Sequence, residues 1–203
     1  GEYFLSPYEE RSFYMELTTI ELTKQYGSKT AVNHLNIALS NGVYGLLGAN
    51  GAGKTTLMRL LCAIQTPTSG KIILNGKSIV GLGEKYRSLL GYLPQHFGYY
   101  PDFAALDFLL YVAALKGLNE KTAKRKSEDL LESVGLSAES NHKIRTFSGG
   151  MKQRIIIAIA LACEPELLIA DEPTTALDVT IQAQILDMMR SLQSKRGTSM
   201  ILI

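Results

Sequence analysis

The 203-residue sequence is poor in cysteine, and it has neither a long hydrophobic run nor a marked excess of charge. Its two cysteines, Cys62 and Cys163, lie far apart in apolar stretches, which favours buried reduced thiols over a disulfide or a metal pair. The longest apolar run, residues 155–163, is too short to span a bilayer, and the start shows no signal-peptide pattern. With 21 basic and 19 acidic residues, the charge balance gives no case for a nucleic-acid surface. We therefore expect a soluble, intracellular chain.

The most informative stretch that is present runs from Val43 to Leu57, VYGLLGANGAGKTTL. Residues 43–47 predict a short buried strand, and residues 48–55 fit G-x-x-x-x-G-K-[ST] at every fixed position. A helical pattern then opens, with an apolar face made by Leu57, Leu60, Leu61 and Ile64. A strand, a glycine-rich turn and a helix form the context that a phosphate-binding P-loop requires.

The residue types of this loop suit phosphate chemistry. Glycines have no Cβ, so the turn can wrap tightly and aim backbone N–H groups inward, and the helix N-terminus adds partial positive charge. Lys54 is expected to bring a full charge to the β- and γ-phosphates, and the Thr55 hydroxyl is expected to ligate Mg²⁺. The candidate nucleotide contacts are Gly48, Asn50, Gly51, Ala52, Gly53, Lys54, Thr55 and Thr56.

An antiparallel β subdomain is predicted near the start of the chain. Residues 15–23 and 32–39 alternate apolar and polar side chains as half-buried strands do, with a hairpin turn at residues 26–29. A further strand at residues 71–75 ends in the tight-turn pair Asn75-Gly76.

The rest of the sequence predicts an α/β fold, with strands that alternate with helices in a mainly parallel sheet. The expected strands are residues 43–47, 89–93, 167–170 and 199–203, and the later helices are residues 150–163 and 178–195. Helical spacing at residues 106–118 and 122–134 interrupts the alternation and predicts an inserted helical subdomain at about 96–150. We expect one P-loop NTPase domain over residues 15–203, preceded by a tail or remnant over residues 1–14.

Two further constellations are candidates for chemistry. Asp171 and Glu172 end a buried strand, where the carboxyl ends of parallel strands line the ligand crevice; alone, the pair is about as compatible with a surface turn. Ser148, Gly149 and Gly150 open a helix whose N-terminus is a second possible anion site, and Ser148 is also an ordinary N-cap residue.

Five ordered motifs carry a specific resemblance. They are the P-loop at 48–55, GYLPQ ending at Gln95, FSGGMKQR at 147–154, LLIADEP at 167–173 and TALD at 175–178. Over nearly its whole length the chain resembles the nucleotide-binding subunit of ATP-binding cassette (ABC) transporters. In that family these motifs are called Walker A, the Q-loop, the signature, Walker B and the D-loop.

The resemblance implies roles for several residues. Glu172 would be the general base, Gln95 would reach Mg²⁺ and the attacking water, and Asp171 would support Mg²⁺ with Thr55. The catalytic set would thus be Glu172, Gln95 and Lys54. Tyr26 matches the aromatic residue that stacks on adenine, although a simple turn tyrosine is the alternative.

Other implied roles concern a second copy of the domain. Ser148, Gly149 and Gly150 would contact the γ-phosphate of ATP held by the other protomer, and Asp178 would lie across the dimer interface. The histidines match no family histidine, so structural or surface roles are expected for His34, His96 and His142.

The implied partners are a second nucleotide-binding subunit and transmembrane permease subunits, without nucleic acid, at the cytoplasmic face of the membrane. Aromatic residues after Gln95 could face a permease or pack in the helical subdomain: Phe97, Tyr99, Tyr100 and Phe103. The alternative function is a non-transport ABC ATPase that acts on ribosomes or DNA. Residues 172–186 resemble the peptide-importer branch, whereas residues 43–116 look more like an exporter-type or unassigned ATPase.

The resemblance also implies a histidine directly after the strand at residues 199–203, which contacts the γ-phosphate in the family. The chain ends at Ile203, so a truncated cassette is expected, with ATP binding retained and hydrolysis slowed. Its last strand is expected to be exposed.

Overall fold

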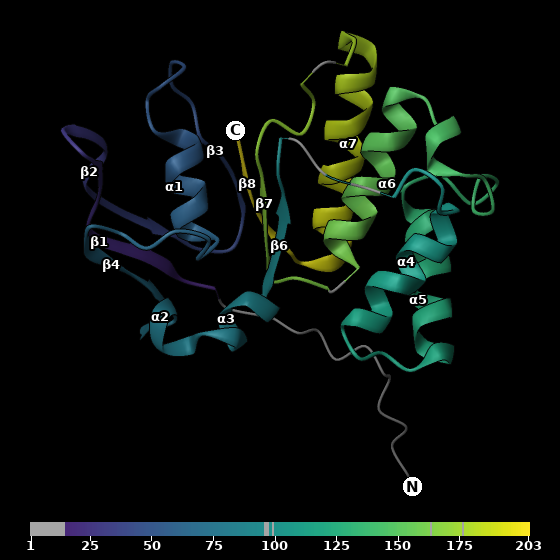
Figure 1. Cartoon of the computed structure of the whole chain (residues 1–203), viewed down its shortest axis with the longest axis horizontal. Helices are drawn as coiled ribbons and strands as arrows, with labels where there is room; N and C mark the ends of the chain where they lie inside the picture. The colour runs from purple at the N-terminus through teal and green to yellow at the C-terminus, as the bar shows by residue number, and fades with distance from the viewer. Residues whose placement is uncertain (1–14, 96–97, 99, 163, 176) are drawn as a thin grey trace, which may run out of the picture.

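The computed structural model describes residues 15–203 except 96, 97, 99, 163 and 176. The predicted tail at residues 1–14, and the expectations for His96, Phe97, Tyr99 and Cys163, lie outside the described residues. Figure 1 shows an antiparallel sheet on one side, a parallel sheet in the middle and a group of helices on the other side.

The antiparallel sheet has the order β2-β1-β4-β5. Its strands are β1 (Leu17–Tyr26), β2 (Lys29–Leu39), β4 (Ser69–Leu74) and β5 (Lys77–Ser78). The predicted hairpin at residues 26–29 is confirmed, since Tyr26 pairs with Lys29. Asn75 and Gly76 have φ values of 49° and 76° and join β4 to β5, as the sequence pair predicts.

The second sheet is wholly parallel, with the order β3-β8-β7-β6. Its strands are β3 (Val43–Gly45), β6 (Leu90–Leu93), β7 (Leu167–Ala170) and β8 (Ser199–Leu202). All four residues of β7 are buried, because β7 is an inner strand with covered faces. The α/β fold with a mainly parallel core sheet is therefore as predicted.

Two expectations about this sheet were wrong. The last strand, β8, is not exposed: it lies between β3 and β7, and Ser199, Met200 and Ile201 are buried. The strand before the P-loop is not buried, because β3 lies at the sheet edge, where Val43 is 50% exposed. Strand order decides both outcomes, and the residue pattern within a single strand does not reveal it.

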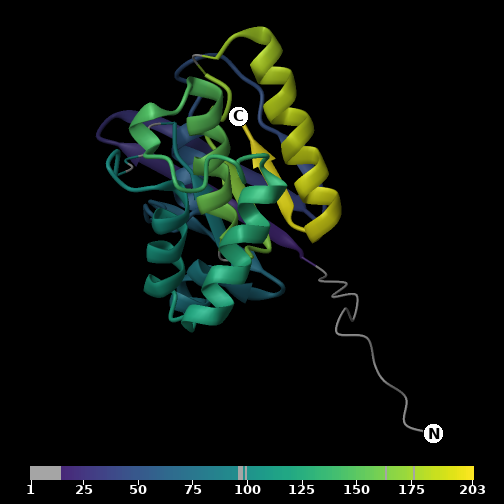
Figure 2. The same cartoon turned by 90° about the vertical axis from the view of Figure 1, so that its right-hand side faces the viewer.

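The helices divide into two groups. On one side are α1 (Lys54–Leu61), α2 (Ile79–Leu82) and α3 (Glu84–Ser88), of which α2 and α3 were not predicted. On the other are α4 (Ala105–Leu115), α5 (Glu120–Ser133), the 3-10 turn Ile144–Thr146, α6 (Gly149–Leu161) and α7 (Val179–Arg196). Figure 2 shows α7 alongside β8, along the outer side of the molecule.

Helix α1 lies between the two sheets and carries the P-loop at its start (Figure 1). Its buried face consists of Leu57, Met58, Leu60 and Leu61, which pack in one cluster with side chains of β1 and of the parallel sheet. Ile64, expected on the same face, lies beyond the end of the helix and is 57% exposed. The burial of α1 therefore anchors the P-loop to both sheets.

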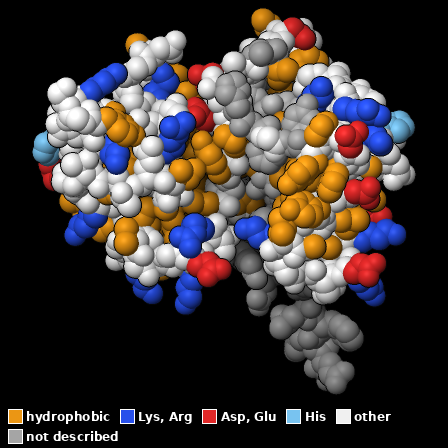
Figure 3. Space-filling view, viewed as in Figure 1, with side chains coloured by type: hydrophobic (Ala, Val, Ile, Leu, Met, Phe, Trp, Pro, Cys, Tyr) orange, Lys and Arg blue, Asp and Glu red, His pale blue; other side chains and the backbone are white. Residues whose placement is uncertain are grey.

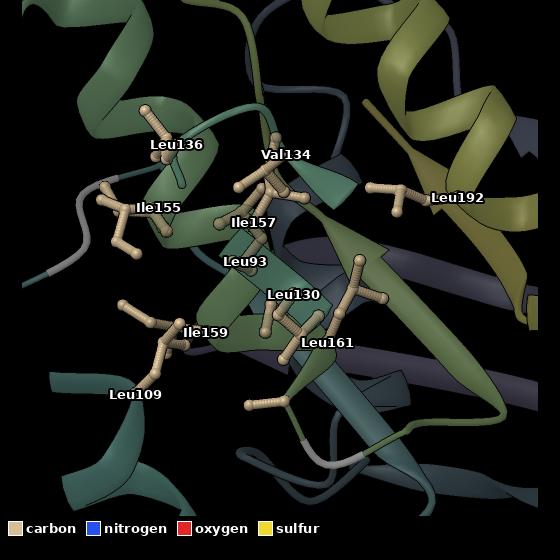
Figure 4. Close-up of a cluster of buried hydrophobic side chains, with 14 of the residues drawn as sticks. Leu93, Leu109, Leu130, Val134, Leu136, Ile155, Ile157, Ile159, Leu161 and Leu192 are labelled. Atoms are coloured by element: carbon tan, nitrogen blue, oxygen red, sulfur yellow. The ribbon is translucent and has the colours of Figure 1, made fainter. Parts of the chain in front are cut away.

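A second core cluster lies on the other side of the parallel sheet. Helix α6 crosses its centre, and seven of its residues from Ile155 to Leu161 are buried. Figure 4 shows side chains from β6, α4, α5, α6 and α7 converging there, including Leu93, Leu109, Leu130, Ile157 and Leu192. This cluster joins α4 and α5 to the parallel sheet. Within the described residues, no helix combines the length and apolarity needed to cross a membrane.

Candidate functional site

The P-loop turn depends on two glycines with left-handed backbone conformations. Gly51 and Gly53 have φ values of +83° and +89°, which residues with a Cβ rarely adopt. At Gly53 a Cβ would lie 2.0 Å from the backbone oxygen of Ala31, which belongs to β2. The β1–β2 hairpin thus sits directly against the P-loop, and only glycine allows this approach.

The start of α1 is arranged for an anion. Gly53 is the N-cap residue and supplies no side-chain hydrogen bond to the first turn, which contains no acidic residue. The Nζ atom of Lys54 donates to the backbone oxygens of Gly48 (2.6 Å) and Ala49 (3.1 Å). Backbone N–H groups and the ammonium group are therefore gathered in one turn, as anion binding requires.

Asp171 is only 4% exposed and follows β7 directly, with its backbone N–H donating to Leu93 of β6 over 2.8 Å. The Thr55 side chain and the positive charges of Arg59 and Lys54 all lie near enough to lower its pKa. Burial raises the pKa of Asp171, and the negative charge of Glu172 raises it further, whereas Thr55 and the two cations oppose the shift. The structure thus brings Walker A and the Walker B aspartate together.

Glu172 adopts a left-handed backbone conformation, with a φ of +51°, which is uncommon for a residue with a Cβ. Its Oε2 atom accepts hydrogen bonds from Nε2 of Gln95 and from the hydroxyl of Thr175, each over 2.7 Å. The structure thus brings together Gln95 and Glu172, two residues to which the resemblance assigns separate roles. The hydrogen bond from the Thr175 hydroxyl was not predicted, because it depends on a turn in which the backbone N–H of Thr175 donates to the backbone oxygen of Glu172 over 3.2 Å.

The signature residues Ser148, Gly149 and Gly150 form the start of α6. The Ser148 side chain caps the helix by accepting from the N–H of Met151 at 3.3 Å, so its N-cap role is present. A Cβ on Gly149 would lie 3.4 Å from Leu177, and one on Gly150 would lie 3.0 Å from Ile181. The glycine pair therefore lets α6 pack closely on the segment that opens α7.

Asp178 is the N-cap residue of α7. Its side chain accepts from the N–H of Ile181 at 2.9 Å, and it is exposed. Sequence reasoning assigned Asp178 only to a dimer interface and missed this N-cap role, although Asp before a helical pattern is its usual signal.

Tyr26 lies at the end of β1 and is 44% exposed. Its hydroxyl donates to Oε1 of Gln65 over 2.5 Å, and the Nζ atom of Lys24 lies 5.3 Å from its ring centroid. An exposed ring on the hairpin that touches the P-loop is compatible with the predicted stacking role.

Side chains outside this site take structural or surface positions. Cys62 is buried at the end of α1, where burial and the nearby charge of Asp171 raise its pKa to about 12, so its thiol is protonated and unreactive at neutral pH. His34 and His142 are exposed.

Two of the aromatic residues that follow Gln95, Tyr100 and Phe103, lie in a group of rings beside α4. The ring of Phe103 lies 5.1 Å from that of Tyr100 and 5.9 Å from that of Phe108, a buried residue of α4. Phe103 therefore packs toward the core, whereas Tyr100 is 52% exposed. Figure 3 shows hydrophobic side chains gathered over the α4 region, where Tyr111 and Leu115 are also exposed.

The comparisons with known proteins agree with this geometry. The family described as ABC transporter matches residues 32–175, most of the chain. The chain belongs to the ABC transporter family. It is 42% identical over 180 residues to the uncharacterized ABC transporter ATP-binding protein YxlF of Bacillus subtilis, covering 87% of this chain and 59% of that protein. It is 39% identical to the bacitracin transport ATP-binding protein BcrA of Bacillus licheniformis, covering 92% of this chain and 60% of that protein.

Solved structures of the family share the fold. The chain matches cbiO1 of Clostridium perfringens, described as part of the ABC transporter complex cbiONQ, with a TM-score of 0.82, 27% identity, and coverage of 92% of this chain and 76% of that one. The present chain spans about three fifths of the length of the two relatives YxlF and BcrA. Similar proteins include the Nod factor export ATP-binding protein I of Cupriavidus pinatubonensis and the methionine import ATP-binding protein MetN of Corynebacterium diphtheriae, so similarity alone does not set a direction of transport.

Proposed function

We propose that this ABC chain binds ATP with Mg²⁺, hydrolyses it, and acts as the nucleotide-binding subunit of a transporter. The proposal rests mainly on one observation: residues of Walker A, Walker B and the Q-loop lie together at the carboxyl end of the parallel sheet. Thr55 of the P-loop lies close enough to Asp171 to lower the pKa of that carboxyl, and Glu172, the next residue, accepts a hydrogen bond from Gln95. Ligands of open α/β sheets bind in crevices at this end of the strands.

The donor set fits a magnesium ion that is shared with phosphates. Mg²⁺ prefers hard oxygen ligands and usually takes few protein groups together with phosphate oxygens. The residues that would hold it are Thr55, Asp171 and Gln95. In the part of the chain that the structure describes, no three His, Cys, Asp or Glu residues cluster as a metal cage, which fits a site completed by the nucleotide. When bound, the ion would neutralise charge on the β- and γ-phosphates.

The side chains divide the remaining work. The P-loop N–H groups and Lys54 bind the phosphates and stabilise the charge that develops on them. Glu172 is the general base that takes a proton from the attacking water, and Gln95 orients Glu172 through the hydrogen bond to Oε2. Tyr26 offers an exposed ring for the adenine base, and Asn50, Ala52 and Thr56 complete the P-loop contacts.

A second copy of the chain would complete the site. Ser148, Gly149 and Gly150 would contact the γ-phosphate bound by the other protomer, with Asp178 at the interface. In support, Ser148 and Asp178 are exposed at the starts of α6 and α7, which pack together through Gly150 and Ile181. The membrane partner would be a permease, which places the chain at the cytoplasmic face of the membrane; the exposed Tyr100 and Tyr111 are available for it.

The test compares the wild-type chain with the Glu172→Gln variant in MgATP. The amide retains the shape of Glu172 but cannot take a proton, so ATP affinity should persist while turnover falls by about 10²- to 10⁴-fold. Size-exclusion chromatography with MgATP should show a dimer that accumulates in the variant. Turnover that is equal in both proteins would contradict the role of Glu172, and absence of ATP binding to the wild type would contradict the proposal as a whole.

A further inference from the structure

The loop that follows α1 is fastened to the end of β1 by several hydrogen bonds. The Tyr26 hydroxyl donates to Oε1 of Gln65 (2.5 Å), and the Nζ atom of Lys24 donates to the backbone oxygen of Thr66 (2.7 Å). The backbone N–H of Gln25 donates to the hydroxyl of Thr68 (3.0 Å). This loop continues the helix that begins at the P-loop, so the two ends of α1 contact the same hairpin.

Two contacts restrain the Tyr26 ring itself, one of these hydrogen bonds and a cation beside the ring. Gln65 is half-buried and fixes the hydroxyl edge of the ring, and Lys24, also half-buried, places its ammonium group 5.3 Å from the ring centroid. The Lys24 ammonium group also donates to the backbone oxygen of Thr66, so its position near the ring does not depend on the ring alone. One face of Tyr26 is therefore occupied by a cation, which leaves the opposite face for a planar ligand.

An exposed tyrosine without such contacts would rotate freely about its side-chain bonds. Ordering a mobile side chain costs about 0.5–1.5 kcal/mol on binding, equal to about a twofold to twelvefold loss of affinity. A ring that is already held avoids this cost. The contacts made by Gln65 and Lys24 thus have a consequence for ligand binding that is separate from folding.

We propose that Gln65 and Lys24 are positioning residues that hold the Tyr26 ring for stacking against the nucleotide base. The inference rests on the proposed nucleotide-binding function and adds two residues that act through Tyr26. They act on the base and leave the triphosphate contacts unchanged, because the phosphates are bound by the P-loop and Lys54 at the other end of α1. The relevant ligand chemistry is an aromatic base attached to a triphosphate.

The experiment measures dissociation constants of the whole chain for ATP and for inorganic tripolyphosphate by calorimetry, in the presence of Mg²⁺. Gln65→Leu retains the volume of the side chain but removes the acceptor, so ATP should bind about threefold to tenfold more weakly. Tripolyphosphate, which has no base, should bind as in the wild type. Tyr26→Phe removes the donor of the same hydrogen bond. It should likewise weaken the binding of ATP and leave the binding of tripolyphosphate unchanged.

Matched variants separate positioning from folding. Gln65→Glu retains an acceptor oxygen and should bind ATP as the wild type does. Gln25→Leu makes the same chemical change beside Tyr26, on an exposed side chain, and should change neither affinity. Lys24→Met keeps the length of the stem but removes the ammonium group, and should weaken ATP binding without affecting tripolyphosphate.

The outcomes that overturn the inference are distinct from failure of the proposed function. ATP affinity within twofold of wild type in Gln65→Leu and Tyr26→Phe would exclude the positioning role while leaving nucleotide binding intact. Tighter ATP binding in Gln65→Leu would mean that Gln65 holds the ring away from the base. Equal weakening of ATP and tripolyphosphate would assign Gln65 to the folding of the P-loop region. A wild type that binds neither ligand would instead contradict the proposed function.

Discussion

Thr175 donates its hydroxyl hydrogen to Oε2 of Glu172 over 2.7 Å, and the same oxygen accepts from Gln95. In the described part of the chain, Thr175 and Gln95 both donate to the same oxygen of the Glu172 carboxylate. This arrangement fixes the rotation of the side chain and leaves Oε1 as the atom suited to take a proton. The left-handed backbone of Glu172 brings Thr175, three residues later, within reach.

Thr175→Val should lower turnover of MgATP by about tenfold with ATP affinity within twofold of wild type. Valine has nearly the same volume but removes one of the two donors, and a hydrogen bond to a charged group contributes about 1.5–3 kcal/mol at most. The measurement is steady-state ATPase kinetics with separate ATP titration. Thr175→Ser retains the hydroxyl and serves as the control, with turnover near wild type. A valine variant with full turnover would show that Gln95 alone orients Glu172.

Sequence patterns were sufficient for the parts of the site that depend on local spacing. The P-loop, the Asp171–Glu172 pair and the N-cap role of Ser148 follow from short motifs, because residue type and backbone conformation are coupled there over a few positions. The parallel sheet followed from the alternation of strands and helices.

Features that depend on strand order or on long-range contact did not follow from the sequence. The edge position of β3 and the central position of β8 arise from pairing between residues more than 150 positions apart, such as Val43 and Met200. The charge of Arg59 near Asp171 and the hydrogen bond between Tyr26 and Gln65 require the packing of α1 between the sheets. Neither involves a motif that local spacing reveals.

Lys54→Ala should weaken ATP binding by about tenfold to a hundredfold. The ammonium group is the full positive charge at the P-loop turn, and charge-assisted hydrogen bonds to phosphate are among the stronger ones. Calorimetric titration of ATP measures the change. Lys77→Ala removes an exposed lysine from β5 and is the control for a loss of one positive charge. Nearly unchanged ATP affinity in Lys54→Ala would contradict the P-loop assignment.

Gly53→Ala and Gly51→Ala should differ in stability although both residues have positive φ values. The two substitutions share a backbone penalty of about 1–2 kcal/mol. At Gly51 a Cβ meets no atom within 4 Å, whereas at Gly53 it would overlap the Ala31 oxygen at 2.0 Å. Gly53→Ala must therefore also displace the hairpin, and thermal unfolding without nucleotide should show the lower Tm for this variant. Equal melting temperatures would mean that the β1–β2 hairpin moves away from the new Cβ with no loss of stability.

Asp171→Asn should stabilise the fold at neutral pH while weakening the use of Mg²⁺. Burial and the charge of Glu172 raise the pKa of Asp171 in the folded chain above its ordinary value of 3.8, so folding favours the protonated form. The favourable contribution of the protonated group is fully present below pH 3.8 and is lost as the pH rises through the raised folded value. At neutral pH the wild type therefore holds a buried charge that asparagine replaces with a neutral amide.

The measurement is the melting temperature of wild type and Asp171→Asn without nucleotide between about pH 3 and pH 8. The variant should melt higher at pH 7, by about 2–4 °C for each 1 kcal/mol gained in a chain of this size. The difference should shrink toward acid, because the wild-type carboxyl is then protonated in both folded and unfolded chains. Its Mg²⁺-dependent gain in ATP affinity should be smaller than that of the wild type, since a neutral amide is a weaker ligand for the ion. A variant that melts lower than wild type at pH 7 would show that Thr55, Arg59 and Lys54 more than offset the cost of burying the Asp171 carboxylate.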